Sequence, residues 1–256
     1  MPNKPLKNVS ILLVEDNEMN TLLASAILQR IGANITEVDN GMEAVNLLKK
    51  QSFDVILMDL HLPVMNGFET TKYIRNTLQL NIPIIAITAN VVNGEEKKCL
   101  EAGMNAFISK PYTEKNLVEK INNCISNQTQ STTQVANTEK PETTDLYDLT
   151  PLRKICNGSQ QLISDMLRTF IKQVPETMKD IRLAYQQRNF EALFAAAHNI
   201  KPNIDMLEIS SLKNHIREIE RFAGEQKNGS ELLGLIDVLD MVLIKVVENL
   251  KAKELA

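Results

Sequence analysis

The sequence contains no tryptophan and only three cysteines among 256 residues. Cys99, Cys124 and Cys156 are odd in number and far apart, which suggests neither a disulfide framework nor a zinc site. We expect them to be ordinary reduced thiols. The longest apolar runs are no longer than a β-strand, and the first residues lack the apolar region of a signal peptide. Because a bilayer-spanning helix needs about 20 apolar residues, we expect no membrane segment and a cytoplasmic protein.

Neither sign of charge dominates, because 28 Lys and Arg residues stand against 32 Asp and Glu residues. Without a basic excess, direct binding to nucleic acid is not expected, and a protein partner is favoured. Hydrophobic residues make up 43% of the chain and charged residues 23%, which is ordinary for a globular protein. The length exceeds that of a usual single domain and predicts two domains of roughly 100–150 residues each.

Residues 8–125 alternate short apolar runs with amphipathic segments, which is the pattern of successive βα units. Gly32 and Gly103 stand where a helix has to end before the next strand. The pattern predicts an α/β domain with a doubly wound, five-stranded parallel sheet, in which the first and third strands lie side by side. The predicted strands are Ser10–Glu15, Asn34–Val38, Asp54–Met58, Pro83–Ile87 and Ala106–Ser109.

Residues 126–145 contain only Val135 and Ala136 as apolar side chains, so we expect a flexible linker there. Beyond the linker, apolar residues recur at the spacing of amphipathic helices, with short turns between the stripes. This predicts an all-α helical bundle over residues 146–254. The stripes are Ile163, Met166, Leu167, Phe170 and Ile171; Met178, Ile181 and Tyr185; Phe190, Leu193, Phe194 and Ala197; Leu212, Ile216, Ile219 and Phe222; and Leu232, Leu235, Ile236, Leu239, Val242, Val246 and Leu250.

Carboxylates stand at the ends of two strands that are neighbours in the predicted sheet. Glu15 and Asp16 close the first strand, and Asp59 closes the third. Because sites in such sheets form beyond the carboxyl ends of the strands, these three side chains should converge. Clustered carboxylates repel one another, and a hard divalent cation relieves the repulsion. The sequence therefore predicts a Mg²⁺ site.

Two further strand ends supply a hydroxyl and an ammonium. Thr88 ends the fourth strand and Lys110 ends the fifth. Beside a metal-bound carboxylate they form a cradle for a phosphoryl group, in which Lys110 neutralises oxygens and Thr88 donates a hydrogen bond. Asp59 can then be the nucleophile, because phosphoryl transfer needs mainly positioning and charge neutralisation. A single Asp at a strand end is more often a helix N-cap, so the joint placement carries the prediction.

The motifs that hold these residues resemble the receiver domain of bacterial response regulators. They are LLVEDN (12–17), DVILMDLHLPVMNG (54–67), PIIAITAN (83–90) and AFISKPY (106–112). The resemblance covers residues 8–125 and implies a flavodoxin-like fold with the strand order 2-1-3-4-5.

The resemblance implies roles for the acidic cluster and its neighbours. It implies that Asp59 is phosphorylated, and that Asp16 and Asp59 bind Mg²⁺ directly together with the backbone carbonyl of His61. Glu15 is implied to act largely through water. The side chain of His61 occupies a position that tunes the dephosphorylation rate in the family, although a surface histidine is usually just solvated.

The resemblance also implies three local features around the cradle. The Lys110–Pro111 peptide bond is expected to be cis, which only an X-Pro bond tolerates well. Thr88 and Phe107 match the switch positions of the family, which move together on phosphorylation. Ala89 is small and should leave an acyl phosphate open to an incoming histidine.

His198 is the candidate functional residue of the helical half. It falls roughly 120° from the centre of the apolar stripe on its own helix, so we expect its side chain to be exposed. His215 lies within about 45° of its stripe and is expected to be a core or interhelix residue. Lys201 follows His198 by one helical turn and can place an ammonium beside a phosphoryl group on the imidazole. An exposed helical histidine alone usually has no function.

The segment AHNIKPNIDMLEI (197–209) resembles the histidine-containing phosphotransfer (HPt) domain, a four-helix bundle with one or more helices added at its start. This resemblance covers residues 146–254 and implies that His198 carries a phosphoryl group. Pro202 is a departure, since the family commonly has glycine at that position. Its missing N–H and its steric clash with the preceding turn predict a kink or a locally loosened helix.

Together the two resemblances imply a phosphorelay protein of bacterial two-component signalling. An upstream histidine kinase would phosphorylate Asp59, and His198 would pass the phosphoryl group from a receiver, its own or another chain's, to a downstream response regulator. The linker would keep the domains at high local concentration. No glycine-rich nucleotide-binding lid is visible, so no ATP-binding kinase domain is expected.

Three alternatives remain open from the sequence. The chain can be the C-terminal receiver–HPt part of a larger hybrid sensor kinase. It can be a metal-dependent phosphohydrolase with Asp59 as nucleophile, although that chemistry usually needs a second acid two residues on, where this chain has His61. It can also be a docking module that never carries phosphate.

Overall fold

A computed structural model describes residues 4–88, 95–126 and 146–254. The described residues form two compact units, one on each side of the predicted linker. All of that linker except Ser126 lies outside the described residues. No helix in the described ranges combines the length and the hydrophobicity that crossing a bilayer requires.

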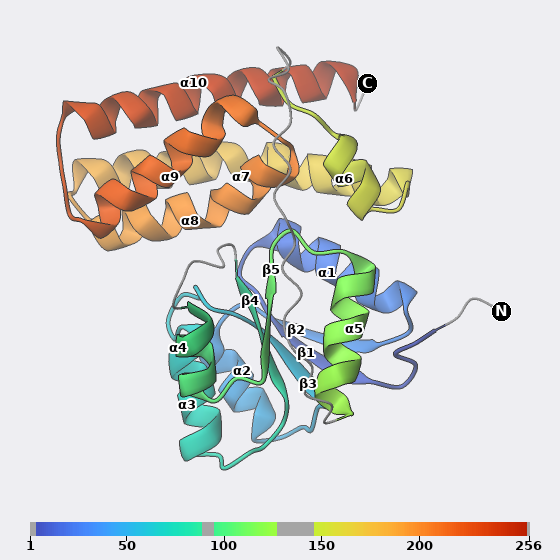
Figure 1. Cartoon of the computed structure of the whole chain (residues 1–256). Coiled ribbons are helices and arrows are strands. Elements are labelled where there is room, and N and C mark those ends of the chain that lie inside the picture. The colour runs from blue at the N-terminus through green and yellow to red at the C-terminus, as the bar shows by residue number, and fades with distance from the viewer. Residues whose placement is uncertain (1–3, 89–94, 127–145, 255–256) are drawn as a thin grey trace. The chain divides into compact units, whose positions relative to one another are not determined.

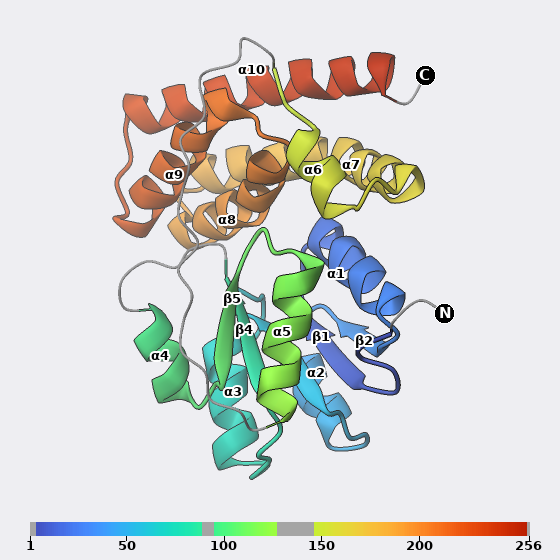
Figure 2. The same ribbon diagram turned by 45° about the vertical axis from the view of Figure 1, so that its right-hand side comes forward.

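The N-terminal unit is a parallel sheet between two layers of helices (Figures 1 and 2). The strands lie in the order β2-β1-β3-β4-β5, which confirms the predicted topology. The strands are β1 (Ser10–Val14), β2 (Asn34–Val38), β3 (Val55–Asp59), β4 (Ile84–Thr88) and β5 (Ala106–Ser109). The helices are α1 (Glu18–Arg30), α2 (Gly41–Leu48), α3 (Gly67–Asn76), α4 (Glu95–Ala102) and α5 (Glu114–Ile125).

The central strands form because they can bury both faces. All residues of β3 and β4 are buried, as expected for strands covered by helices on both sides of a parallel sheet. Gly32 and Gly103 have φ angles of +93° and +99°, in the left-handed region that glycine adopts without strain after a helix. The observed strands differ from the predicted ones by at most one residue at either end.

Side-chain caps fix where the helices after the strands begin. Asn17 accepts a hydrogen bond from the backbone N–H of Asn20 at the start of α1. Asn66 and Glu69 form a reciprocal capping box at the start of α3. Such caps satisfy backbone N–H groups that the helix itself leaves without partners. They therefore fix the loops that follow β1 and β3, where the acidic residues stand.

The C-terminal unit is a helical bundle, as predicted (Figure 1). In the bundle α8 packs against α7 and α9, and α10 packs against the same two helices. The short helix α6 precedes these four. The bounds are α6 (Thr150–Ile155), α7 (Gln160–Gln186), α8 (Phe190–Met206), α9 (Ser210–Gly224) and α10 (Ser230–Lys253).

Two prolines lie inside helices of this bundle. The first two predicted stripes are not on separate helices, because α7 continues through Pro175. Buried Val174 lies between the two stripes, so the apolar face of the helix is continuous across the proline. The helix therefore does not end there. Helix α8 likewise continues through Pro202, which is buried within the bundle.

Candidate functional site

The first cluster lies at the carboxyl ends of β1 and β3, which are adjacent strands. The pairing of Val14 with Met58 brings the residues that follow them to one edge of the sheet. Glu15, Asp16 and Asp59 each offer a carboxylate oxygen, and these oxygens lie within 4.8 Å of one another. Glu15 and Asp59 are buried, and Asp16 is partly buried. The predicted convergence of the three carboxylates is therefore present in the fold.

Lys110 projects into this cluster from the end of β5. Its Nζ lies 2.6 Å from Glu15 Oε2 and 2.5 Å from Asp59 Oδ2. Burial by itself lowers the pKa of the Lys110 ammonium, but the Asp59 and Glu15 carboxylates outweigh burial and raise this pKa above its ordinary value. The amine is therefore held as a buried cation. The Lys110–Pro111 peptide bond is cis, the geometry that the resemblance implies.

The surroundings of Glu15 disfavour its ionised form. Burial and the Asp59 carboxylate raise the pKa of Glu15 to about 7, although Lys110 and the Asn20 amide oppose the shift. Asn20 Nδ2 donates to Glu15 Oε1 at 3.0 Å. The sequence interpretation missed Asn20. Asn20 lies on the first turn of α1, a few residues after Glu15 and Asp16, and this position could have indicated a contact with them.

Asp59 is fixed through both of its carboxylate oxygens. The backbone N–H of His61 donates to Oδ1 at 3.0 Å, while Oδ2 bonds Lys110. Gly67 packs directly against the backbone of Asp59, since a Cβ atom on residue 67 would lie 2.2 Å from the backbone oxygen of Asp59. Only a residue without a side chain fits so close to the backbone. The end of β3 and the start of α3 are thus locked together.

Thr88 ends β4, and Phe107 lies within β5. Thr88 is buried, and its backbone oxygen accepts a hydrogen bond from the Lys110 N–H at 2.7 Å. Phe107 on β5 is partly buried. Ala89 lies outside the described residues.

The chemistry of the donor set suits a hard divalent cation. All three side chains offer oxygen ligands, and Mg²⁺ prefers oxygen ligands, usually one or two carboxylates with water molecules retained. The three carboxylates repel one another, and the single Lys110 ammonium offsets only part of this repulsion. A divalent cation would offset more of it.

The second cluster lies between α8 and α9 and surrounds His198. The expectation that His198 is exposed was wrong, since its residue surface is only 8% exposed. Its ring stacks on Phe194 of the same helix with 5.9 Å between ring centroids. Its Nδ1 lies 2.8 Å from Glu220 Oε1 on α9. The prediction considered only the angle of His198 around α8. It did not include the neighbouring helix α9, which covers one edge of the ring.

Lys201 does not project from the helix surface either. It is 1% exposed, and its Nζ bonds Glu220 Oε1 at 2.6 Å and Oε2 at 2.7 Å. Burial alone would raise the pKa of Glu220, but the hydrogen bond from His198 and the Lys201 ammonium outweigh it and lower this pKa below its ordinary value. Glu220 is therefore an ionised, buried carboxylate shared by both predicted residues. The sequence interpretation did not find it.

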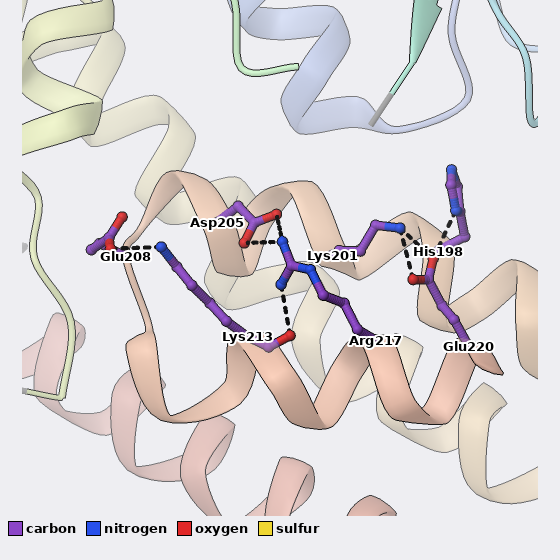
Figure 3. A network of polar contacts seen from close by, with 7 residues as sticks. All are labelled: His198, Lys201, Asp205, Glu208, Lys213, Arg217 and Glu220. Atoms are coloured by element: carbon purple, nitrogen blue, oxygen red, sulfur yellow. Dashed lines mark hydrogen bonds and ion pairs between the residues drawn. The ribbon is translucent and has the colours of Figure 1, made fainter. Parts of the chain in front are cut away.

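A second set of contacts joins α9 to α8 and to the loop between these helices, farther along the same interface (Figure 3). Arg217 bonds both carboxylate oxygens of Asp205, at 3.0 and 3.2 Å, and Lys213 bonds Glu208 at 2.6 Å. These partly exposed pairs fix how the two helices align more than they stabilise the fold. His215 is half-buried, in keeping with the interhelix position expected for it.

Two family models match the chain. The model described as "Response regulator receiver domain" matches residues 11–122, and the model described as "Hpt domain" matches residues 165–252. Neither is a model of a kinase domain.

Among curated proteins, the polar-differentiation response regulator DivK of Brucella anthropi is 37% identical over 113 residues, which cover 44% of this chain and 92% of DivK. The sensor protein GacS of Pseudomonas syringae pv. syringae is 25% identical over 247 residues, which cover 92% of this chain and 27% of GacS. The chain thus spans less than a third of the length of the sensor kinases that it matches.

Among solved structures, a similar chain is the receiver domain of the sensor histidine kinase PA1611 from Pseudomonas aeruginosa PAO1, with a magnesium ion coordinated in its active site cleft. The sequence identity is 39% and the TM-score is 0.44. The match covers 46% of this chain and 98% of the PA1611 receiver domain.

Proposed function

We propose a specific phosphorelay route for this chain, which belongs to the response regulator receiver family over residues 11–122 and carries an Hpt domain over residues 165–252. Asp59 is the acceptor of the receiver domain, and His198 is the carrier of the HPt domain. The observation that carries the proposal is the contact of the buried Lys110 ammonium with Asp59, beside two further carboxylates at the same sheet edge.

In the first step, a carboxylate oxygen of Asp59 attacks the phosphorus of a phosphohistidine on an upstream kinase. The new O–P bond forms as the P–N bond breaks, and the imidazole leaves. Lys110 offsets negative charge at the acceptor, and Thr88 is placed to donate to a phosphoryl oxygen. Asp16 and Asp59, with the backbone carbonyl of His61 and with Glu15 through water, would hold Mg²⁺, which supplies charge neutralisation when bound.

In the second step, His198 takes the phosphoryl group from Asp59 of its own or another chain and delivers it to a downstream receiver. Neither step uses ATP, because both exchange one phosphorylated side chain for another. The alignment with GacS spans both domains, which supports a working partnership with a histidine kinase core, in the same chain or in another. The cytoplasmic location expected from the sequence is part of this proposal.

Labelling by acetyl phosphate with Mg²⁺ tests the first step. Wild type should acquire an acyl phosphate, and Asp59→Asn should acquire none. Asp39→Asn is a matched control, because Asp39 follows β2 and is exposed. Equal labelling of wild type and Asp59→Asn would remove Asp59 from the mechanism. Sustained turnover of p-nitrophenyl phosphate by wild type would instead favour a phosphohydrolase.

A further inference from the structure

The helix α10 carries apolar side chains on two of its faces. Its outer face exposes Leu233, Met241 and Ile244, which are 38%, 50% and 50% exposed. A helix at the surface of a globular protein is normally polar on the face that is turned away from the core. The outer face of α10 therefore has the character of a surface that another molecule covers. The inner face buries Leu232, Ile236, Leu239, Leu243 and Val246 in the bundle.

The outer face of α10 borders a groove between α10 and α7. The groove has a volume of about 660 Å³, and buried Met178 and Val247 line it together with the exposed Leu183 and Ile244. The apolar surface of the bundle is thus concentrated on one side. Within residues 146–254, the helices expose large apolar side chains at Leu183, Leu233, Met241 and Ile244, all of which lie on α7 or α10.

This side of the bundle lies opposite the interface that holds His198. Helices α8 and α10 both pack against α7 and α9, so α8 and α10 are diagonal to each other in the bundle (Figure 1). The groove between α7 and α10 is therefore across the bundle from the α8–α9 interface. A molecule bound in the groove would leave that interface uncovered.

Two opposite charges flank the centre of the outer face at equal distances. Asp237 and Lys251 stand seven residues before and after Ile244, a spacing that keeps all three on one face of α10. The two charges are about 21 Å apart along the helix, which is too far for them to pair with each other. Lys251 is exposed and has no carboxylate partner among the described residues. The side chain of Asp237 is 58% exposed, although Arg182 Nη1 lies 3.0 Å from its Oδ1.

We propose that this face binds a second copy of the chain, with the two α10 helices antiparallel and crossing at Ile244. A two-fold axis at Ile244 places Asp237 of each copy beside Lys251 of the other copy, so the same ion pair forms twice. The two Ile244 side chains meet at the axis and cover each other. Opposite charges placed symmetrically about an apolar centre favour a second copy over an unrelated protein, whose binding would need no such symmetry.

The neighbouring charges fit the same arrangement. Asp240 and Glu248 stand four residues before and after Ile244, so the two-fold axis brings these acidic residues of the two copies together. Arg182 of α7 lies at this point, because its Nε and Nη2 bond Asp240 Oδ2 at 3.0 and 2.6 Å. Its guanidinium offsets the charge of Asp240 and places a cation where Glu248 of the other copy would arrive. Helix α7 thus supplies the counter-charge that this pairing needs.

The face is small, so the association should be weak. The α10 residues that line the groove, from Asp240 to Lys251, span about 17 Å of the helix. Contacts at the low end of interface sizes belong to transient complexes, and we expect a dissociation constant on the order of 100 μM. The dimer should therefore form and dissociate reversibly as the concentration of the chain changes.

Sedimentation velocity of the unphosphorylated full chain, between about 5 and 500 μM, tests the proposal. Wild type should shift from monomer to dimer over this range. Ile244→Asp places two carboxylates at the axis and should raise the dissociation constant by roughly tenfold or more. Because Ile244 is half exposed, the bundle should keep its fold, which circular dichroism checks. Leu100→Asp is the matched control, since Leu100 is 56% exposed on α4 of the other unit.

Three results would overturn the proposal. The first is a wild type that stays monomeric at every concentration. The second is an Ile244→Asp variant that associates as strongly as wild type. The third is loss of the dimer in Leu100→Asp but not in Ile244→Asp, which would place the association in the receiver domain.

Exchange of the two flanking charges tests the antiparallel crossing itself. Asp237→Lys and Lys251→Glu should each weaken the dimer by roughly threefold to tenfold, because every substitution occurs twice in a two-fold dimer. The double variant Asp237→Lys/Lys251→Glu restores opposite charges across the axis and should recover the association of wild type. A double variant as weak as the weaker single variant would overturn the crossing at Ile244. These measurements need no phosphorylation, so their outcome is independent of the proposed function.

Discussion

At the scale of single residues, both sites depend on one buried charge shared between two partners. In the receiver domain the Lys110 ammonium lies between the carboxylates of Glu15 and Asp59. In the bundle the arrangement is reversed, since the Glu220 carboxylate lies between the imidazole of His198 and the ammonium of Lys201. Buried charges are costly unless paired, so each group is held firmly in place. Because each central charge contacts two partners, its removal should change the electrostatics of both partners.

Lys110→Gln should separate metal binding from phosphorylation. Removing a cation 2.5 Å from Asp59 should strengthen Mg²⁺ binding by roughly tenfold, because the ammonium repels the metal. The same change should slow labelling by acetyl phosphate, because the phosphoryl oxygens lose their cation. Isothermal titration calorimetry measures the affinity, and exposed Lys115→Gln is the control. Weaker Mg²⁺ binding in Lys110→Gln would contradict the electrostatic account of the cluster.

The sequence predicted the arrangement of the receiver cluster more completely than that of the cluster around His198. Residues at strand ends were placed correctly, because parallel strands bring their carboxyl ends to one edge whatever the details of packing. His198 was proposed as a functional residue, but its burial was not predicted, because the angular position on α8 describes only that helix. Glu220 stands directly after Ile219, at the border of the apolar stripe of α9. Such a border position does not reveal whether the side chain turns to solvent or to the next helix.

At the scale of secondary-structure elements, the junction of β3 and α3 fixes the position of Asp59, the proposed acceptor. The N–H of Gly67 donates to the backbone oxygen of Leu60 at 3.0 Å, and the capping box at Asn66 orients the start of α3. The resemblance of the motif predicted a functional role for the segment. The close backbone approach at Gly67 is a property of the folded chain and could not be read from a glycine alone.

Gly67→Ala should displace the end of β3. A Cβ atom would lie 2.2 Å from the backbone oxygen of Asp59, so backbone has to move, at a cost of about 1–3 kcal/mol in the free energy of unfolding. Labelling of Asp59 should fall with it.

Gly234→Ala in α10 is the matched control for this substitution. A Cβ atom there meets nothing within 4 Å, so the change should stabilise the fold by about 0.5–1 kcal/mol. Urea denaturation measures both free energies. Equal stability of Gly67→Ala and wild type would show that the junction is not rigid.

The elements themselves were predicted from sequence with one clear error. Strand bounds agree within a residue, because a doubly buried strand is a continuous apolar run between polar loop residues. The sequence pattern predicts separate stripes on either side of Pro175, whereas α7 runs through this proline. Buried Phe170, Val174 and Met178 continue one apolar face across the proline. Packing against α8 and α10 thus overrides the local preference to end the helix.

At the scale of the whole molecule, the chain joins two units whose sites have complementary chemistry. One holds a carboxylate in an acidic, metal-suited cluster, and the other holds an imidazole whose Nδ1 lies 2.8 Å from a carboxylate oxygen. An aspartyl phosphate is a reactive mixed anhydride, whereas a phosphohistidine is the form in which a kinase and a carrier exchange the group. The two domains together therefore permit a relay, in which the receiver domain would carry the acyl phosphate and the bundle would carry the phosphohistidine.

The central claim is that the phosphoryl group moves between Asp59 and His198. Its most direct test is a time course of wild type labelled with acetyl [³²P]phosphate and Mg²⁺, in which base treatment removes acyl phosphate and leaves phosphohistidine. The account predicts that base-labile label appears first and that base-stable label on His198 follows. It also predicts that Asp59→Asn stays unlabelled and that His198→Gln, unlike the control His215→Gln, keeps only base-labile label. Wild-type label that never becomes base-stable, at any chain concentration, would contradict it.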